Sequence, residues 1–322
     1  MGSGSFIRVR YRKKLWLVPI VAMLASAVAA LVVLGSYQSR SAQAHTTSAV
    51  VVGAGDIASC TSNGDSATAR LLANISGTVL AIGDNAYMEG SAAQFNNCYG
   101  PTWGKFKART LPIVGNHEYR TSGASGYFNY FGAAAGPAGK GYYSYDRGAW
   151  HIIALNSECK YWATGYKDGP SQCSSQKQAD MIAWLKEDLA ANSSTACTLA
   201  YFHQPRFSSG QGGNALETQP IWDALYAANA DVVLSGHDHV YERFAPQTPS
   251  GQLDTARGIR QFVVGSGGVN HGRFNTIKAN SQVRNASAYG VLKLTLNSTS
   301  YSWKFVPEAG KSFTDSGTYS CH

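Results

Sequence analysis

The chain has 322 residues, of which 44% are hydrophobic and only 14% are charged. This length and composition suit one large globular domain or two modest ones, and they exclude a disordered chain and a coiled coil. The formal net charge of +8 lies mostly in residues 1–44, which hold six of the 27 Lys and Arg residues and no acid. The remainder carries a net charge of only +2, so no nucleic-acid partner is expected.

Residues 1–44 have the order of an export signal. A basic run ends at Lys14, residues 15–34 are almost entirely apolar, and an Ala-Gln-Ala triplet ends at Ala44. This order predicts a signal peptide that is cleaved after Ala44. A stretch of this length can also cross a bilayer, so an uncleaved N-terminal anchor is the alternative. Either way, we expect residues 45–322 to be secreted, or to face outward from a membrane that is contacted only through residues 15–34.

Six cysteines lie after the export segment, and none forms a Cys-x-x-Cys motif. An even number in an exported chain favours disulfides, with buried free thiols as the alternative. Cys159 with Cys173 brackets a loop rich in Gly, Ser and Tyr and is the pair that we favour. Cys60 with Cys98 is the next, because both are expected to follow strands that end on the same edge of a sheet. Those two pairs leave Cys197 with Cys321.

From residue 49 onward, short apolar runs alternate with helical patterns. Runs rich in β-branched residues predict buried strands at 49–54, 78–82, 111–114, 151–155, 198–202 and 231–234. Amphipathic stretches predict helices at 65–74, 176–191 and 217–229. Residues 259–306 return to strands, with strict alternation at 292–296 and a turn near 297–299. The sum predicts a layered α/β domain without a separable second domain.

Metal-ligand side chains follow five of the predicted strands. The segments are Gly55-Asp56, Gly83-Asp84-Asn85-Ala86-Tyr87, Gly115-Asn116-His117-Glu118, Phe202-His203-Gln204-Pro205 and Gly236-His237-Asp238-His239. In an open α/β sheet, ligands bind outside the carboxyl ends of the strands, so we expect the five segments to converge on one edge. A glycine before the ligand in four of them permits a sharp exit from the strand and a close approach of the backbone.

Taken singly, each segment also fits a turn, a helix cap or a buried core histidine. The joint pattern is harder to explain in that way, because two Asp, one Asn and three His each come directly after an apolar strand. Mixed oxygen and nitrogen ligands suit Fe, Mn or Zn better than Ca or Mg. The sequence therefore predicts a metal site.

At these residues the chain resembles the calcineurin-like metallophosphoesterases and, within them, the purple acid phosphatases. The resemblance runs from about Val50 to Glu242, and residues 236–243 are especially similar to the plant-type members. It implies an αββα sandwich of two mixed β-sheets flanked by helices. It also implies that Asp84 bridges two metal ions. One ion is then held by Asp56, Tyr87 and His239, and the other by Asn116, His203 and His237.

Tyr87 sets the expected metal. Many relatives have Asp-x-His in the first motif, whereas Asp56-Ile57-Ala58 offers no imidazole. Tyr87 can fill that position as a phenolate, which favours Fe(III) there and Fe(II), Zn or Mn at the second site. The alternative is that Tyr87 only packs in the pocket.

The resemblance also implies roles for residues beside the ligands. His117 corresponds to a histidine that binds phosphate and protonates the leaving oxygen, and Glu118 can orient it. Arg206 and Arg243 can contact the phosphate of the substrate, although surface arginines without that role are the alternative.

These residues lead us to expect hydrolysis of small-molecule phosphomonoesters by a metal-activated hydroxide, without a covalent intermediate. A phosphodiesterase or nucleotidase on the same dimetal core is one alternative. A secreted metal-binding or phosphate-binding protein without activity is the other. The sequence assigns no oligomeric state.

Overall fold

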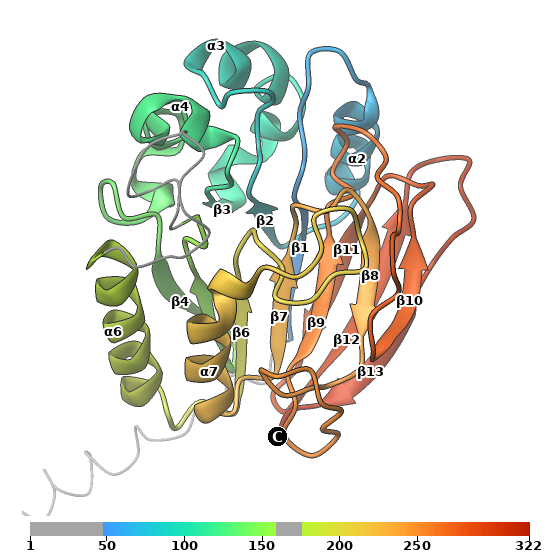
Figure 1. Cartoon of the computed structure of the whole chain (residues 1–322). Coiled ribbons are helices and arrows are strands. Elements are labelled where there is room, and N and C mark those ends of the chain that lie inside the picture. The colour runs from blue at the N-terminus through green and yellow to red at the C-terminus, as the bar shows by residue number, and fades with distance from the viewer. Residues whose placement is uncertain (1–47, 159–175) are drawn as a thin grey trace, which may run out of the picture. The chain divides into compact units, whose positions relative to one another are not determined.

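The computed structural model describes residues 48–158 and 176–322 as a layered α/β domain with two β-sheets (Figure 1). The predicted export segment and the predicted Cys159–Cys173 pair lie outside the described residues. Within the described part of the chain, no helix is both long enough and apolar enough to cross a membrane.

The first sheet has six strands in the order β13-β12-β11-β1-β2-β3. Their bounds are β1 Ala49–Ala54, β2 Thr78–Ile82, β3 Thr110–Ile113, β11 Gly290–Leu296, β12 Ser300–Pro307 and β13 Ser316–Ser320. Strands β1, β2 and β3 run parallel, whereas β11 is antiparallel to both β1 and β12. The sheet is therefore mixed, as expected.

The second sheet has seven strands in the order β10-β8-β9-β7-β6-β5-β4. Their bounds are β4 Tyr143–Arg147, β5 Trp150–Ala154, β6 Cys197–Tyr201, β7 Val232–Ser235, β8 Tyr241–Phe244, β9 Arg260–Val264 and β10 Ser281–Asn285. Strands β5, β6, β7 and β9 are parallel, and β4, β8 and β10 join antiparallel, so this sheet is also mixed.

Large aromatic side chains fill the space between the two sheets. Three ring pairs each join a strand of one sheet to a strand of the other, with ring centroids 4.5–5.8 Å apart. They are Trp150 with Tyr301, Tyr241 with Phe305, and Phe262 with Trp303. Such rings bury a large apolar area, so this layer is the main core that holds the sheets together.

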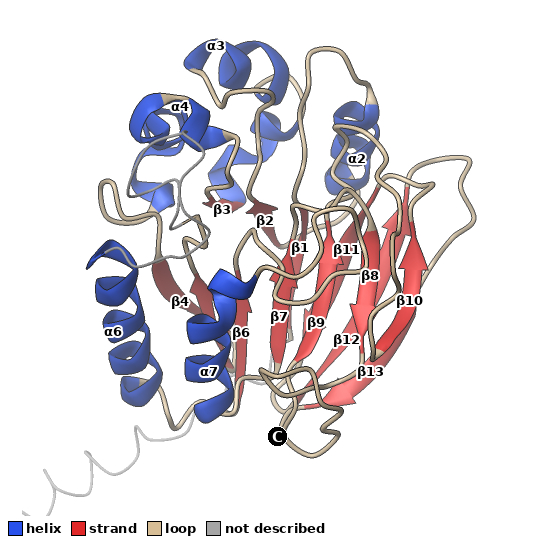
Figure 2. Ribbon diagram, viewed as in Figure 1, coloured by secondary structure: helices blue, strands red, loops and turns tan. Residues whose placement is uncertain are grey.

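Helices flank the sheets and also lie beyond the ends of the strands (Figure 2). Their bounds are α2 Gly64–Ala73, α3 Ala92–Gln94, α4 Ser125–Phe131, α6 Gln176–Ala191 and α7 Gln219–Ala227. Helix α2 packs on β11, and α6 lies beside α7 along the seven-stranded sheet. The buried residues of α6 include Met181, Leu185 and Leu189, three members of its apolar stripe. The expected sandwich of two mixed sheets flanked by helices is confirmed.

The predicted strands lie within one residue of the observed ones, and the alternation at 292–296 appears in β11 as alternately buried and partly buried side chains. The predicted helix at 217–229 is shorter than expected. A 3-10 turn at Leu216–Thr218 precedes α7, whose first turn contains Pro220. Proline is favoured there because its fixed φ and missing N–H suit the start of a helix.

Two disulfides lie in the described residues, and both were expected. Cys60 joins Cys98 with a Cα–Cα distance of 5.0 Å, and Cys197 joins Cys321 with 5.6 Å. None of the described cysteines is free. The first bond ties together the segments that follow β1 and β2, and the second ties β6 of one sheet to the end of β13 in the other.

A buried histidine holds α6 against the sheet. His151 on β5 is 2.9 Å from Asp146 on β4 through Nδ1 and 2.8 Å from Asp188 on α6 through Nε2. Burial by itself would lower the pKa of His151, but the hydrogen bonds to Asp188 and Asp146 raise it above the ordinary value of 6.5. The imidazolium form therefore links three elements.

We expect Asp188→Asn to destabilise the protein most at low pH. A folded-state pKa that is raised means that the stabilisation is complete below about pH 6.5 and is lost as the pH rises through the folded-state value. Urea unfolding should show a loss of about 1.5–3 kcal/mol near pH 5 and a smaller loss near pH 8.5. Glu187→Gln, an exposed change on the same helix, is the control. A loss that grows with pH would contradict this account.

Candidate metal centre

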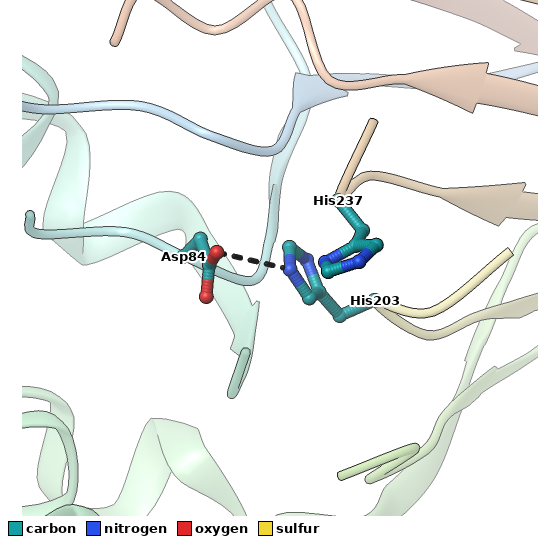
Figure 3. Close-up of side chains that lie close together, drawn as sticks. All are labelled: Asp84, His203 and His237. Atoms are coloured by element: carbon teal, nitrogen blue, oxygen red, sulfur yellow. Dashed lines mark ion pairs between the residues drawn. The ribbon is translucent and has the colours of Figure 1, made fainter. Parts of the chain in front are cut away.

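The loops that carry the predicted ligands leave the carboxyl ends of β1, β2, β3, β6 and β7. The first three strands belong to the six-stranded sheet, and the last two belong to the seven-stranded sheet. We expected the loops to converge at the edge of one open sheet, but they meet where the corresponding ends of two sheets adjoin. Figure 3 shows Asp84, from the six-stranded sheet, facing His203 and His237, from the seven-stranded sheet. The strand pattern could not reveal this, because it does not specify which sheet each strand joins.

Three of the predicted ligands have a left-handed backbone. Asp56, Asp84 and His237 have φ values of 60°, 49° and 69°. Residues with a Cβ adopt this conformation seldom, and each instance costs about 1–3 kcal/mol that the surrounding structure must offset. The strands thus end in sharp turns that aim these side chains into the site.

Glycines that directly precede predicted ligands let the loops approach one another closely. Gly83 itself has a φ of 76°. A Cβ on Gly115 would lie 2.2 Å from Oδ1 of Asp84, and a Cβ on Gly236 would lie 2.8 Å from Oδ2 of Asp56. Both distances are far below van der Waals contact, so any side chain there would push a carboxylate out of place.

One group of polar side chains surrounds Tyr87. Its hydroxyl oxygen lies 2.7 Å from Oδ1 of Asp56 and 2.9 Å from Oδ2 of Asp84, so the single phenol proton is shared between two carboxylates. The same oxygen lies 3.2 Å from Nε2 of His239. Nε2 of His239 is itself 3.3 Å from Oδ1 of Asp56. Burial, together with the two carboxylates, raises the pKa of the phenol well above its ordinary value. Ionising Tyr87 therefore requires a strong positive charge close to its oxygen.

A second group shares Asp84 with the first. Asp84, His203 and His237 offer ligand atoms that all lie within 4.8 Å of one another (Figure 3). Nδ1 of His237 is 3.0 Å from Oδ1 of Asn116. The seven predicted ligands therefore lie in two adjoining groups with Asp84 common to both.

His203 gives the clearest sign that a cation fits here. Its Nδ1 lies 2.9 Å from the Ile82 carbonyl oxygen, so this nitrogen carries the proton. Among the described residues, Nε2 has no hydrogen-bond partner of good geometry, although it is buried and only 3.2 Å from Oδ2 of Asp84. Burial alone would lower the pKa of His203, but Asp84 raises it well above the ordinary value. The pocket thus demands a positive charge between the two groups, which a proton or a metal cation can supply.

His117 lies beside these groups and is partly exposed. Its backbone N–H donates to Oδ1 of Asp84 at 2.8 Å, and its ring lies 4.3 Å from the ring of Tyr87. Nδ1 is 2.6 Å from the Met88 carbonyl oxygen, and Nε2 is 3.8 Å from Oδ2 of Asp84. The ring is therefore oriented by the Met88 carbonyl group, and Nε2 faces the site.

The expectation that Glu118 orients His117 is wrong. The buried Glu118 carboxyl group accepts hydrogen bonds from four backbone N–H groups instead, at 2.7–3.2 Å: those of Asp84, Asn85, Ala86 and Gly115. Burial and the nearby Asp84 raise its pKa to about 8, and the N–H groups partly offset this effect. Glu118 therefore fixes the loop that carries Asp84 against the loop that carries Asn116.

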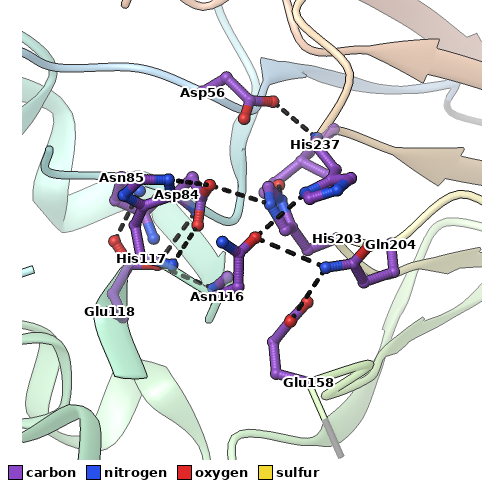
Figure 4. Close-up of polar contacts among 12 residues, drawn as sticks. Asp56, Asp84, Asn85, Asn116, His117, Glu118, Glu158, His203, Gln204 and His237 are labelled. Carbon is purple, nitrogen blue, oxygen red and sulfur yellow. Dashed lines mark hydrogen bonds and ion pairs between the residues drawn. The ribbon is translucent and has the colours of Figure 1, made fainter. Parts of the chain in front are cut away.

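The sequence analysis missed polar residues at a sixth strand end. Asn156, Ser157 and Glu158 follow β5, and the Glu158 carboxyl group accepts hydrogen bonds from Ser157 Oγ at 3.0 Å and from Gln204 Nε2 at 3.1 Å (Figure 4). Gln204 Nε2 is also 3.5 Å from Oδ1 of Asn116. Burial raises the pKa of Glu158 to about 7. The sequence contained the same indication as at the other five segments, because residues 156–158 are polar and directly follow the strand predicted at 151–155.

The two predicted substrate arginines have other partners. Arg206 is 7% exposed, donates to Oε1 of Gln219 and lies over the ring of Phe207. Arg243 forms an ion pair with Asp315 at 2.7 Å, and its side chain is 12% exposed. Neither is a free surface residue. Contact of either arginine with phosphate stays a prediction.

Comparisons with known proteins identify the family of this chain. A family model described as calcineurin-like phosphoesterase matches residues 49–241. Purple acid phosphatase 23 of Arabidopsis thaliana is 32% identical over 160 residues, which cover 44% of this chain and 32% of that protein. An acid phosphatase of Aspergillus ficuum is 25% identical over 224 residues, which cover 54% of this chain and 36% of that protein. The matches thus span about a third of the length of these relatives.

Solved structures share the fold. A purple acid phosphatase from yellow lupin seeds superposes with a TM-score of 0.62 at 19% identity, covering 85% of this chain and 54% of that chain. The Plasmodium protein GAP50, described as the anchor in the inner membrane complex, gives a TM-score of 0.63 at 14% identity. The match covers 83% of this chain and 88% of that chain. At such identities the likeness supports the fold alone.

We expect Glu118→Ala to destabilise the domain strongly, because it leaves four backbone N–H groups without their acceptor. Each buried donor left unpaired costs about 1–3 kcal/mol. Glu118→Gln keeps one acceptor oxygen and should lose less. Urea unfolding measures both, with Glu89→Ala, an exposed change in the neighbouring loop, as the control. Equal stability of Glu118→Ala and Glu89→Ala would exclude this role.

Proposed function

Because the chain belongs to the calcineurin-like phosphoesterase family, we propose that it is a dinuclear metal-dependent phosphatase that hydrolyses small-molecule phosphomonoesters. One observation carries the proposal: side chains from five strand ends meet around Asp84, where buried His203 Nε2 faces a carboxylate oxygen without a hydrogen-bond partner among the described residues. The similarity to proteins named purple acid phosphatase supports the assignment as a phosphatase.

The proposed ligand set divides at Asp84, which belongs to both ions. Asp56, Tyr87 and His239 would hold one ion, and Asn116, His203 and His237 would hold the other. When bound, two such cations neutralise charge on a phosphate group and lower the pKa of water at the site. We assign Fe(III) to the Tyr87 site, because only a highly charged cation offsets the burial and the two carboxylates that disfavour the phenolate. Fe(II), Zn or Mn would occupy the second.

His117 would act on the leaving group. With Nδ1 held by the Met88 carbonyl group, the proton that is free to move is the one on Nε2, which faces Asp84 and the site. A positioned imidazolium can donate that proton to the departing alkoxide. The cluster uses no Ser or Cys nucleophile, which suits phosphoryl transfer, since that reaction depends more on charge neutralisation and positioning than on covalent help.

We further propose that the domain is exported. The basic, apolar and small-residue order of residues 1–44 supports this, as do the Cys60–Cys98 and Cys197–Cys321 disulfides, because such bonds persist in oxidising compartments.

The function is tested by turnover of 4-nitrophenyl phosphate and of its bis-ester by metal-loaded protein, with and without a chelator. We expect chelator-sensitive turnover that favours the monoester. His117→Ala should lower turnover by about 10²–10⁴-fold with unchanged metal content, and Asp84→Ala should lose metal and activity together.

His271→Ala, a histidine outside the ligand set, is the control for His117→Ala. Preference for the bis-ester would indicate a phosphodiesterase. Metal binding without any turnover would indicate a binding protein. Loss of metal in His117→Ala would contradict the ligand assignment.

The Fe(III) assignment is tested by the visible spectrum. A phenolate bound to Fe(III) has a charge-transfer band, so iron-loaded protein should be coloured and Tyr87→Phe should lose the colour. Tyr130→Phe, a tyrosine outside the site, should keep it. Fully active protein that contains zinc or manganese, lacks iron and has no band would refute the assignment and leave Tyr87 as a wall of the pocket.

A further inference from the structure

We propose that Glu158 and Gln204 are positioning residues that fix which end of the Asn116 amide faces the second metal ion. The inference rests on the ligand set of the proposed function. An asparagine side chain has one oxygen that can ligate a cation and one NH₂ group that cannot. The two ends have almost the same shape, so only the hydrogen-bonding partners of the amide decide its orientation.

A backbone N–H group determines which groups donate and which accept in this row of hydrogen bonds. The Gln204 backbone N–H, a permanent donor, lies 2.9 Å from Ser157 Oγ. The single hydroxyl proton of Ser157 is then directed to Oε1 of Glu158 at 3.0 Å. Oε1 of the buried Glu158 carboxyl group thereby accepts, and above the pKa of about 7 the ionised group accepts at both oxygens.

Glu158 in turn orients the side-chain amide of Gln204. Oε2 of Glu158 accepts from Gln204 Nε2 at 3.1 Å, so the NH₂ end of Gln204 is turned toward Glu158. The same nitrogen lies 3.5 Å from Oδ1 of Asn116, and Figure 4 shows the three side chains in a row. A reversed Asn116 would set its NH₂ group against that of Gln204, two donors facing each other. Gln204 therefore favours the orientation in which Asn116 presents its oxygen.

His237 cannot do this while it ligates. Its Nδ1 is 3.0 Å from Oδ1 of Asn116. With this Nδ1 as the ligating nitrogen of His237, it has no proton to donate, so the contact would no longer hold the amide oxygen. Gln204 remains as the donor that distinguishes the two ends, and its side chain is 4% exposed.

The experiment is a double-mutant cycle read by metal affinity. Gln204→Met keeps the length of the side chain and removes the donor. Asn116→Asp makes both ends of residue 116 oxygens, so orientation no longer matters. Zn²⁺ is titrated into metal-free protein by calorimetry, and the ions bound per chain are counted. Gln204→Met should weaken Zn²⁺ binding at the second site by about 10–100-fold. In the Asn116→Asp background, the same change should have little effect.

Controls separate positioning from damage to the fold. Gln178→Met removes a buried amide that donates to the Glu217 carbonyl group and should leave Zn²⁺ affinity unchanged. Glu158→Gln, which replaces the acceptor by a group that can also donate, should weaken the second site in the same direction as Gln204→Met. It serves as the test if Gln204→Met does not fold.

The outcomes distinguish this inference from the proposed function. Native-sequence protein that binds no Zn²⁺ would refute the proposed metal centre itself. Zn²⁺ binding in that protein, with unchanged affinity in both Gln204→Met and Glu158→Gln, would overturn the positioning role. An equal loss with Asn or Asp at position 116 would also overturn it, because it would show a general packing effect.

Discussion

The buried carboxylate of Asp84 is the constraint on which the rest of the site depends. It is 1% exposed and lies within 3.2 Å of both Tyr87 and His203. An isolated buried charge is too costly to keep, so the fold must bring positive charge and donors to it. The backbone N–H of His117 donates to this carboxylate, and Glu118 fixes the loop that carries Asp84 by accepting from its N–H groups.

Two sheets rather than one make this arrangement possible. The aromatic layer between them sets their separation, and the glycines at 115 and 236 let the strand ends come within contact of the carboxylates. The Cys197–Cys321 bond also joins one sheet to the other, at the amino end of β6. A site built across two sheets can surround a pair of ions, because ligands approach from both sides.

A layer of neutral and backbone groups sets the orientation of the ligands. The Ile82 carbonyl group holds His203, the Met88 carbonyl group holds His117, and the amide of Gln204 lies beside Asn116. These groups add little charge to a region that already contains several carboxylates. They decide which atom of each side chain faces the site, and therefore what the site can bind.

The sequence by itself determined six of the strands, placed the seven proposed ligands after strands, and led to two of the disulfide pairs. The signals of the strands and ligands are local: an apolar run, a glycine and a polar side chain within a few residues of each other. Only the tertiary structure decided that the strand ends belong to two sheets, that Glu118 binds backbone rather than His117, and that Arg206 and Arg243 are held by Gln219 and Asp315. The contacts of Glu158 and Gln204 beside Asn116 also became visible only in the tertiary structure. The physical reason is that a side chain's hydrogen-bond partner is chosen by proximity in space. Gln204 and Asn116 are 88 residues apart in the chain, so no local pattern could pair them.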